Sequence, residues 1–209
     1  MSLDEVIRAE HARSVALFDE LQPLAREDQR RTTAMSLVAR LAVALKTHVL
    51  AIERVVYAAL RTAGDEPAAL ALRAPHEHRA LDTLVDTLLA LRPGPELAAA
   101  LAVARRFFEQ QAALEERELL PAIERSLPVD ERDQLARDLV AEQRRLRPTV
   151  QRRVHYVPDV FTAKAPSGRQ GRGRQGVFPG GKSSLSFPLA VSASWRFKLW
   201  NTRYEDALI

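Results

Sequence analysis

Three histidines occupy positions that a soluble helical protein usually fills with apolar side chains. His11, His48 and His78 each lie on the apolar stripe of a different predicted helix. Gln111 and Glu115 lie four residues apart on the stripe of a fourth helix, so both can reach one point. A single buried histidine is more often a hydrogen-bonded core residue than a ligand, but three on converging faces favour a cation site. The chain has no cysteine, and imidazole with carboxylate suits iron, manganese or zinc.

Two further carboxylates stand close to these histidines in the sequence. Glu53 follows His48 by five residues, about 140° away around a regular helix, so the two converge only if a π-bulge or another distortion turns the helix. Asp82 follows His78 by four residues. Three interpretations of Asp82 stay open: a second ligand, an outer partner that fixes the tautomer of the His78 imidazole, or an aspartate on the helix surface.

The spacing of apolar residues and turn residues predicts the helices that carry these side chains. The first helix covers about residues 3–22, and the second runs from Leu37 to Ala59 and is closed by Gly64 and Pro67. The third helix has Pro75 in its first turn and Pro93 at its end. The fourth covers residues 96–126 and is interrupted by Pro121, and a shorter fifth helix covers residues 130–147. Short connections force neighbouring helices to be antiparallel. The predicted fold is therefore all-α, an up-down-up-down four-helix bundle with a short fifth helix and no strands.

Composition is that of one soluble domain. The 209 residues are 46% hydrophobic and 28% charged. Uncharged apolar runs such as Leu97–Ala104 are far shorter than the roughly 20 residues of a membrane span. The first residues, MSLDEV, are acidic where a signal peptide would be basic. We expect a cytoplasmic protein without a membrane partner.

The charge of +4 is an average over two unlike parts. Residues 1–150 hold 21 Lys and Arg against 24 Asp and Glu, whereas residues 151–209 hold 10 against 3. We place the boundary between a bundle of residues 1–147 and a basic tail of residues 148–209, which we expect to be largely disordered. Its arginines among glycines and its later aromatic residues allow nucleic-acid binding, but a solvated basic extension is the favoured interpretation.

The segments that carry the candidate ligands resemble the hemerythrin-like, or HHE cation-binding, domain family. They are IRAEHARSVALFDEL, KTHVLAIERVVYAAL, PHEHRALDTLVDTLL and QQAALEERELLPAIERSL, within about residues 3–145. The last is similar to the family element H-x-x-x-E-E-x-E-L-x-P, with Gln111 in place of the histidine. The resemblance implies a four-helix bundle around a non-haem iron pair, with ligand positions at His11, His48, His78 and Glu115. It also places Ile52 where the family has a bridging carboxylate.

These two departures change the expected chemistry. A dinuclear centre needs carboxylates that bridge the ions and offset their charge, and Ile52 provides neither. Gln111 offers only a neutral amide oxygen in place of a nitrogen donor. We therefore favour a mononuclear iron site, held by histidine and Glu115, over a dinuclear one.

Two functional hypotheses follow from the sequence. The leading one is a metal-binding protein, not an enzyme, that senses or stores dioxygen, nitric oxide or iron. The alternative is a metal-free bundle that acts as an interaction module for protein or nucleic acid. His76, at a helix start, and His155, in the basic segment, are expected at the surface.

Overall fold

The structure, a computed structural model, describes residues 1–155 of the chain, and these form only helices and turns. The predicted all-α class is thus confirmed for the described part. The helices are α1 (Leu3–Leu21), a 3-10 turn (Asp28–Arg30), α2 (Arg31–Ile52), α3 (Ala58–Leu60), α4 (Asp65–Ala90), α5 (Pro95–Leu114), α6 (Leu120–Ser126) and α7 (Val129–His155). A π-helical turn, Glu53–Tyr57, joins α2 to α3, and a second, Glu115–Leu119, joins α5 to α6. The predictions made for the tail beyond residue 155 lie outside the described residues.

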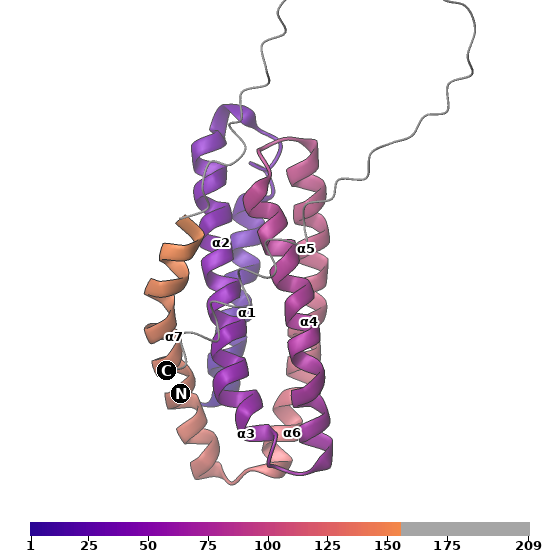
Figure 1. The fold of residues 1–209 in the computed structure, drawn as a ribbon, viewed down its shortest axis with the longest axis vertical. Helices are drawn as coiled ribbons and strands as arrows, with labels where there is room; N and C mark the ends of the chain where they lie inside the picture. The colour runs from indigo at the N-terminus through magenta and orange to yellow at the C-terminus, as the bar shows by residue number, and fades with distance from the viewer. Residues whose placement is uncertain (156–209) are drawn as a thin grey trace, which may run out of the picture. The chain divides into compact units, whose positions relative to one another are not determined.

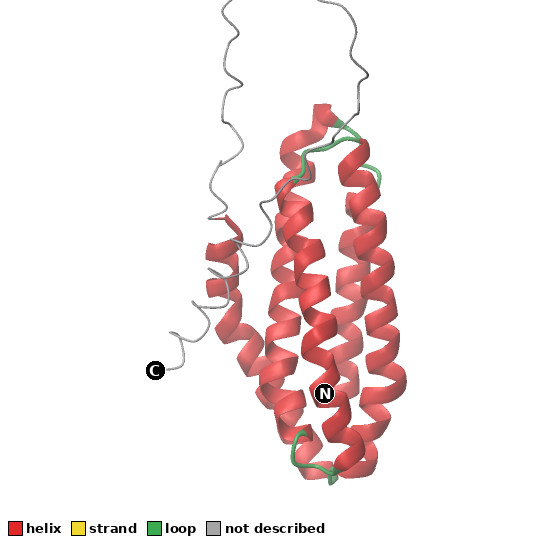
Figure 2. Cartoon of the chain, turned by 45° about the vertical axis from the view of Figure 1, so that its right-hand side comes forward, coloured by secondary structure: helices red, strands yellow, loops and turns green. Residues whose placement is uncertain are grey.

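Long helical rods lie side by side, as Figures 1 and 2 show, and four of them form the bundle. They are α1, α2 with α3, α4, and α5 with α6, and α2 contacts both α1 and α4. The turn after α1 and the turn between α4 and α5 meet at one end, where the Gly94 N–H donates to the Ala25 carbonyl at 2.7 Å. Short turns join successive rods, as the sequence predicted. The fifth long helix, α7, packs against α1 and α2.

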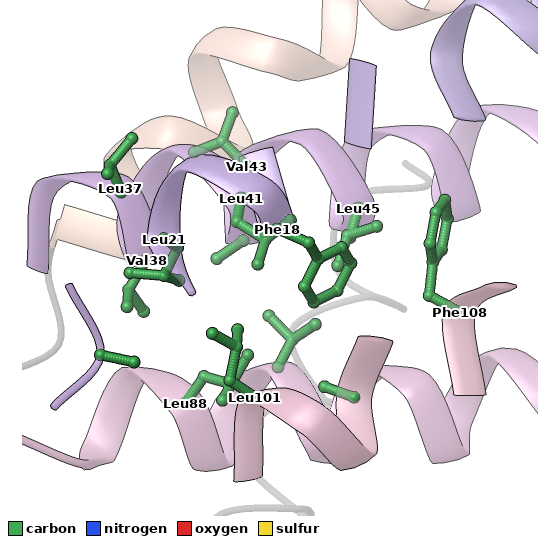
Figure 3. Close-up of a cluster of buried hydrophobic side chains, with 14 of the residues drawn as sticks. Phe18, Leu21, Leu37, Val38, Leu41, Val43, Leu45, Leu88, Leu101 and Phe108 are labelled. Carbon is green, nitrogen blue, oxygen red and sulfur yellow. The ribbon is translucent and has the colours of Figure 1, made fainter. Parts of the chain in front are cut away.

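The interior is divided into two apolar clusters with a polar layer between them. One cluster, drawn in Figure 3, contains Phe18, Leu45 and Phe108, and the other contains Ile7 and Ile52. On every rod, a buried polar residue falls in the sequence between a member of one cluster and a member of the other. Because the helices hold these positions at one level of the bundle, they bring the polar side chains together.

Two helix boundaries differ from the sequence-based prediction. The third long helix, α4, begins at Asp65, so Pro75 lies inside the helix and not in its first turn. Gly64, with a φ of 115°, makes the turn before it, and Pro67 falls in the first turn, where a missing N–H costs little. The prediction therefore placed the start of this helix at the wrong proline, at Pro75 in place of Pro67.

The fifth helix, predicted as a short one ending near Arg147, runs for 27 residues to His155 with Pro148 inside it. Leu146, Val150 and Val154 are buried along its length. Val150 and Val154 belong to the same apolar cluster as Phe18. Packing of this stripe extends the helix past a proline that would end an isolated one.

The stretch from Asp28 to Leu60 is, by length and composition, apolar enough to cross a membrane. In the structure, 67% of its most apolar part is buried inside the protein. The central helix of a soluble bundle has the same composition, so this property is weak support for a membrane span.

Candidate metal centre

The polar layer gathers the five residues whose spacing first suggested a site. His11 comes from α1, His48 from α2, His78 from α4 and Gln111 from the last turn of α5, while Glu115 opens the π-turn that follows α5. All five side chains are buried. Each replaces an apolar residue on the inward stripe of its helix, so the helical period fixes both its depth and its direction.

The Glu115 carboxylate lies at the centre of the three imidazoles. Its Oε2 is 3.1 Å from His11 Nε2 and 3.3 Å from His48 Nε2. Its Oε1 is 3.5 Å from His78 Nε2. Glu115 is 5% exposed. A carboxylate so far from water needs strong partners, and the three imidazole N–H groups are those partners.

Each imidazole also meets a second carboxylate through its other ring nitrogen. Glu116 Oε1 is 2.9 Å from His11 Nδ1. Glu10 Oε2 is 3.2 Å from His48 Nδ1, and Glu53 Oε1 is 2.7 Å from His78 Nδ1.

We call Glu10, Glu53 and Glu116 the outer carboxylates. They are more exposed than Glu115, and two of them are fixed by further partners: Arg8 for Glu116 and Gln143 for Glu10. Every ring nitrogen of the three histidines therefore faces a carboxylate oxygen.

Both π-turns begin at a glutamate that contacts the histidines. Glu53 and Glu115 are the first residues of the two turns. A π-turn adds a residue to one turn of helix and so rotates the following side chains relative to a regular α-helix. The helix after His48 does contain a π-turn, but it begins at Glu53, and no contact between Glu53 and His48 is observed. Glu53 then lies against His78, on the neighbouring rod.

Charge inside the layer fixes the protonation of its members. Burial alone would raise the pKa of the Glu115 carboxyl, but the charge of His48 and the hydrogen bonds from the three imidazoles hold that pKa well below its usual value. Burial is the largest effect on His48 and lowers its pKa. The charge of Glu115 and the hydrogen bonds to Glu10 and Glu115 together outweigh it and raise the pKa of His48 to about 10.

The pKa values of His78 and Tyr57 are raised as well. Burial opposes protonation of His78, but its hydrogen bonds to Glu115 and Glu53 raise the pKa of the imidazole above its ordinary value. Burial, helped by the charge of Glu115, raises the pKa of the Tyr57 phenol, so this side chain stays neutral at physiological pH. The Tyr57 ring lies 5.7 Å from the His78 ring, centre to centre, and closes this side of the layer.

The donor set fits a metal ion. One ligand atom from each of His11, His48 and Glu115 lies within 4.8 Å of the other two, and all three side chains are buried. His78 contacts the other oxygen of Glu115 and can supply a fourth donor. Two or three imidazoles with one carboxylate are a ligand set of non-haem iron and of zinc.

Three candidates from the sequence are not among these inner donors: Glu53, which meets His78 from the outer side, Asp82 and Gln111. Asp82 forms an ion pair with Lys46 and does not point to the imidazoles, although it lies one turn from His78. Gln111 borders a small cavity of about 10 Å³ beside Glu115 and Tyr57. Ile52 is fully buried in an apolar cluster, so no carboxylate enters the layer from its position.

The outer carboxylates Glu10 and Glu116 were not predicted from the sequence. Each is adjacent to a predicted ligand, Glu10 to His11 and Glu116 to Glu115. The signal for these two carboxylates in the sequence was an acidic residue directly beside each candidate ligand. Which histidine each carboxylate meets depends on the neighbouring helix, because Glu10 crosses to His48 and Glu116 to His11.

Comparison with known proteins agrees with this geometry. No curated protein and no solved structure matches the chain. The family model of the hemerythrin HHE cation-binding domain matches residues 2–123, more than half of the chain, which include all four helices that meet in the polar layer. The chain therefore belongs to the hemerythrin HHE cation-binding domain family.

Proposed function

We propose that this protein binds a single non-haem iron ion at the polar layer and uses it to sense or store dioxygen, nitric oxide or iron. The observation that carries the proposal is the convergence of three imidazole Nε2 atoms, from three helices, on one buried carboxylate. His11, His48 and Glu115 would hold the ion, with His78 as a further donor.

The charges of the layer favour one ion over two. Glu115 is the only carboxylate among the candidate inner ligands, and the position from which the family draws a bridging carboxylate carries Ile52, which is fully buried. Two divalent ions would bring four positive charges to one inner carboxylate, whereas one ion brings two. The outer carboxylates add negative charge at a distance, which suits one ion bound by neutral imidazoles.

The outer carboxylates also orient the imidazoles. A carboxylate that accepts the Nδ1–H of a histidine leaves Nε2 as the nitrogen that binds a cation, once the cation displaces the Nε2 proton that Glu115 accepts in the metal-free chain. Glu116, Glu10 and Glu53 stand at the Nδ1 atoms of the three histidines, and all three Nε2 atoms face inward. The chain therefore holds its imidazoles in the orientation that a cation requires.

The surroundings of the layer favour a small ligand. A bound ferrous ion supplies an electron-rich centre to which diatomic gases bind. Phe108 packs edge-on against His11, with ring centres 6.0 Å apart, and keeps water from that side. The cavity of about 10 Å³ beside Glu115 and Gln111 has room for about one water-sized molecule. This size favours a diatomic ligand over a larger substrate.

Thermal stability measures metal binding directly, because a ligand that binds only the folded state stabilises it. Ferrous iron added anaerobically to the metal-free chain at 100 times its dissociation constant should add about 2.7 kcal/mol, which raises the melting temperature by roughly 5–10 °C. Glu115→Gln should lose this shift, whereas Glu124→Gln, which removes an exposed carboxylate, should keep it. An unchanged melting temperature in the unsubstituted chain would contradict the proposal.

A second candidate function rests on a separate observation. Every ring nitrogen of the three histidines already has a carboxylate partner, so the layer is electrostatically satisfied by protons alone. Such a bundle can be stable without metal and act as an interaction module for protein or nucleic acid. The same melting experiment separates the two functions, because this candidate predicts no stabilisation by iron.

A further inference from the structure

A large groove lies between α1, α2 and α7, and it reaches the edge of the metal centre at Glu10 and His48, which both line it. Its volume is about 900 Å³, near the upper end of the range for sites that bind small molecules. Helix α7 forms one wall of the groove, with Val140, Gln143, Arg144 and Arg147. Neither the family match, which ends at residue 123, nor the proposed metal site accounts for this groove.

The groove contains a buried polar group without a partner. The Thr47 side chain lines the groove and is 6% exposed, and its hydroxyl has no hydrogen-bond partner among the described residues. A buried hydroxyl without a partner costs about 1–3 kcal/mol. Such a group is rare in a folded protein. The oxygen itself is covered in the observed conformation, so a ligand in the groove would supply the missing hydrogen bond after rotation about χ1 turns the hydroxyl outward.

Positive charge predominates on the groove. It is lined by four arginines and two glutamates: Arg13, Arg40, Arg144, Arg147, Glu10 and Glu20. Arg13 and Arg40 lie 3.5 and 3.6 Å from the carboxylates of Glu10 and Glu20. Arg144 and Arg147 are exposed on α7 and form no ion pair within the described part of the chain. Two arginines thus remain to bind an anion, and guanidinium groups match carboxylate geometry closely.

The remaining lining is largely apolar. Leu17 of α1, Val43 of α2 and Val140 of α7 contribute to it, together with several alanines. The hydrogen bond from Gln143 to Glu10, and the contact of Glu10 with His48, bring the middle of α7 to the level of Thr47. Arg144, next to Gln143, is therefore near the level of the free hydroxyl, and the apolar wall continues along the groove.

We propose that this groove binds a carboxylic acid with an aliphatic body. The carboxylate would bind at Arg144 and Arg147, Thr47 would turn its hydroxyl toward it, and the aliphatic chain would lie against Leu17 and Val43. The two arginines without an ion pair among the described residues favour an anionic head, and the apolar wall favours a head that carries an aliphatic chain over a free inorganic anion. The occupant would lie beside the contact between Glu10 and His48.

The test uses the full-length, metal-free chain, so its outcome does not depend on iron binding. Decanoate is titrated into the ¹⁵N-labelled protein and followed by NMR, with 1-decanol as a probe of equal length without charge and inorganic phosphate as a probe without an aliphatic chain. We expect decanoate to shift the amide signals of groove residues and to bind at least tenfold more tightly than either other probe, a difference of about 1.4 kcal/mol. Equal binding of decanoate and 1-decanol, no binding of decanoate, or shifts confined to other surfaces would overturn the proposal.

Substitutions assign the head group. The double variant Arg144→Gln, Arg147→Gln should weaken decanoate binding about tenfold, because charge-assisted hydrogen bonds are lost. The matched control is Arg137→Gln, which removes an exposed arginine of the same helix outside the groove and should leave binding unchanged.

Thr47→Val supplies a readout that a merely structural role would not give. It should weaken decanoate binding several-fold while the melting temperature stays equal or rises, because it removes an unsatisfied buried hydroxyl. Unchanged binding in both the double variant and Thr47→Val would refute the assigned head-group site.

Discussion

Replacing Glu115 with Gln tests the electrostatic centre of the protein without any metal. The substitution keeps the size of the side chain but removes the charge that three imidazoles share. Removal of one partner from a buried ion pair costs about 3–5 kcal/mol, because the remaining charge stays buried without compensation. The amide NH₂ group also presents donors to imidazole nitrogens that themselves carry protons.

The expected effect is large compared with the error of a melting experiment. For a domain of this size, each kcal/mol shifts the melting temperature by about 2–4 °C, so the metal-free variant should melt roughly 6–20 °C lower at pH 7. The assay is thermal unfolding followed by circular dichroism of the helices, in the presence of a chelator. Glu124→Gln is the control, because Glu124 is exposed and its substitution should change stability by less than about 0.5 kcal/mol.

The pH dependence of this difference provides a second check. His48 has its pKa raised to about 10 by Glu115 and Glu10, so the wild-type chain loses the ion pair as pH approaches that value. The gap in stability between wild type and Glu115→Gln should therefore narrow between pH 7 and pH 10. A variant as stable as wild type at pH 7, or a gap that does not change with pH, would refute the assignment of a charged His48 beside Glu115.

Three other perturbations have defined outcomes. The pKa of His48 in the folded chain lies above its unfolded value of about 6.5, so its contribution to stability is complete below pH 6.5 and is lost as pH rises toward 10. Denaturant unfolding at pH 6, 8 and 10 should show a steady loss of the free energy of unfolding. A free energy that does not change with pH would contradict this expectation. The double substitution Ile52→Glu, Gln111→His restores the two ligand types that the family pattern has and this chain lacks. Elemental analysis should therefore find more iron per chain in this variant than in wild type. Equal iron in the two proteins would show that these positions do not limit metal binding. Asp82→Ala should lower the free energy of unfolding by about 1–3 kcal/mol, because the buried Lys46 ammonium loses this partner and keeps the more exposed Asp86 carboxylate, 3.0 Å away. Unchanged denaturant unfolding would be inconsistent with the observed ion pair.

The positions of the histidines could be predicted because they depend only on the geometry of a regular helix. His11, His48 and His78 share the apolar stripe of their helices, and a stripe must face the interior of a bundle. Short turns between helices then bring these faces together. The sequence contains all of this information locally, and the polar layer forms at the level where each stripe is interrupted.

The outer contacts could not be predicted, because they depend on how neighbouring helices are placed. Spacing alone placed Glu53 far around the helix from His48, and from that position its carboxylate meets His78 on the neighbouring rod instead. Asp82 is the opposite case, a predicted ligand that the structure does not bring to the histidines. Its spacing suited a second ligand, but Lys46 on the adjacent helix, itself buried, pairs with it.

Helix ends show how tertiary packing overrides a local signal. Pro75 and Pro148 both suggested boundaries, since proline lacks the N–H of a helical hydrogen bond. Both lie inside long helices in the structure. The buried residues on either side, Ala74 and His78 in α4 and Leu146 and Val150 in α7, continue the packed stripe through the proline.

The metal content of the anaerobically reconstituted chain tests the central claim most directly. The full-length protein is loaded with ferrous iron, freed of excess by gel filtration, and its iron is measured against protein concentration. Three imidazoles around one inner carboxylate predict one iron per chain in the wild type, and much less in Glu115→Gln. Negligible iron in the wild type, or equal iron in the two proteins, would contradict a metal centre built on Glu115.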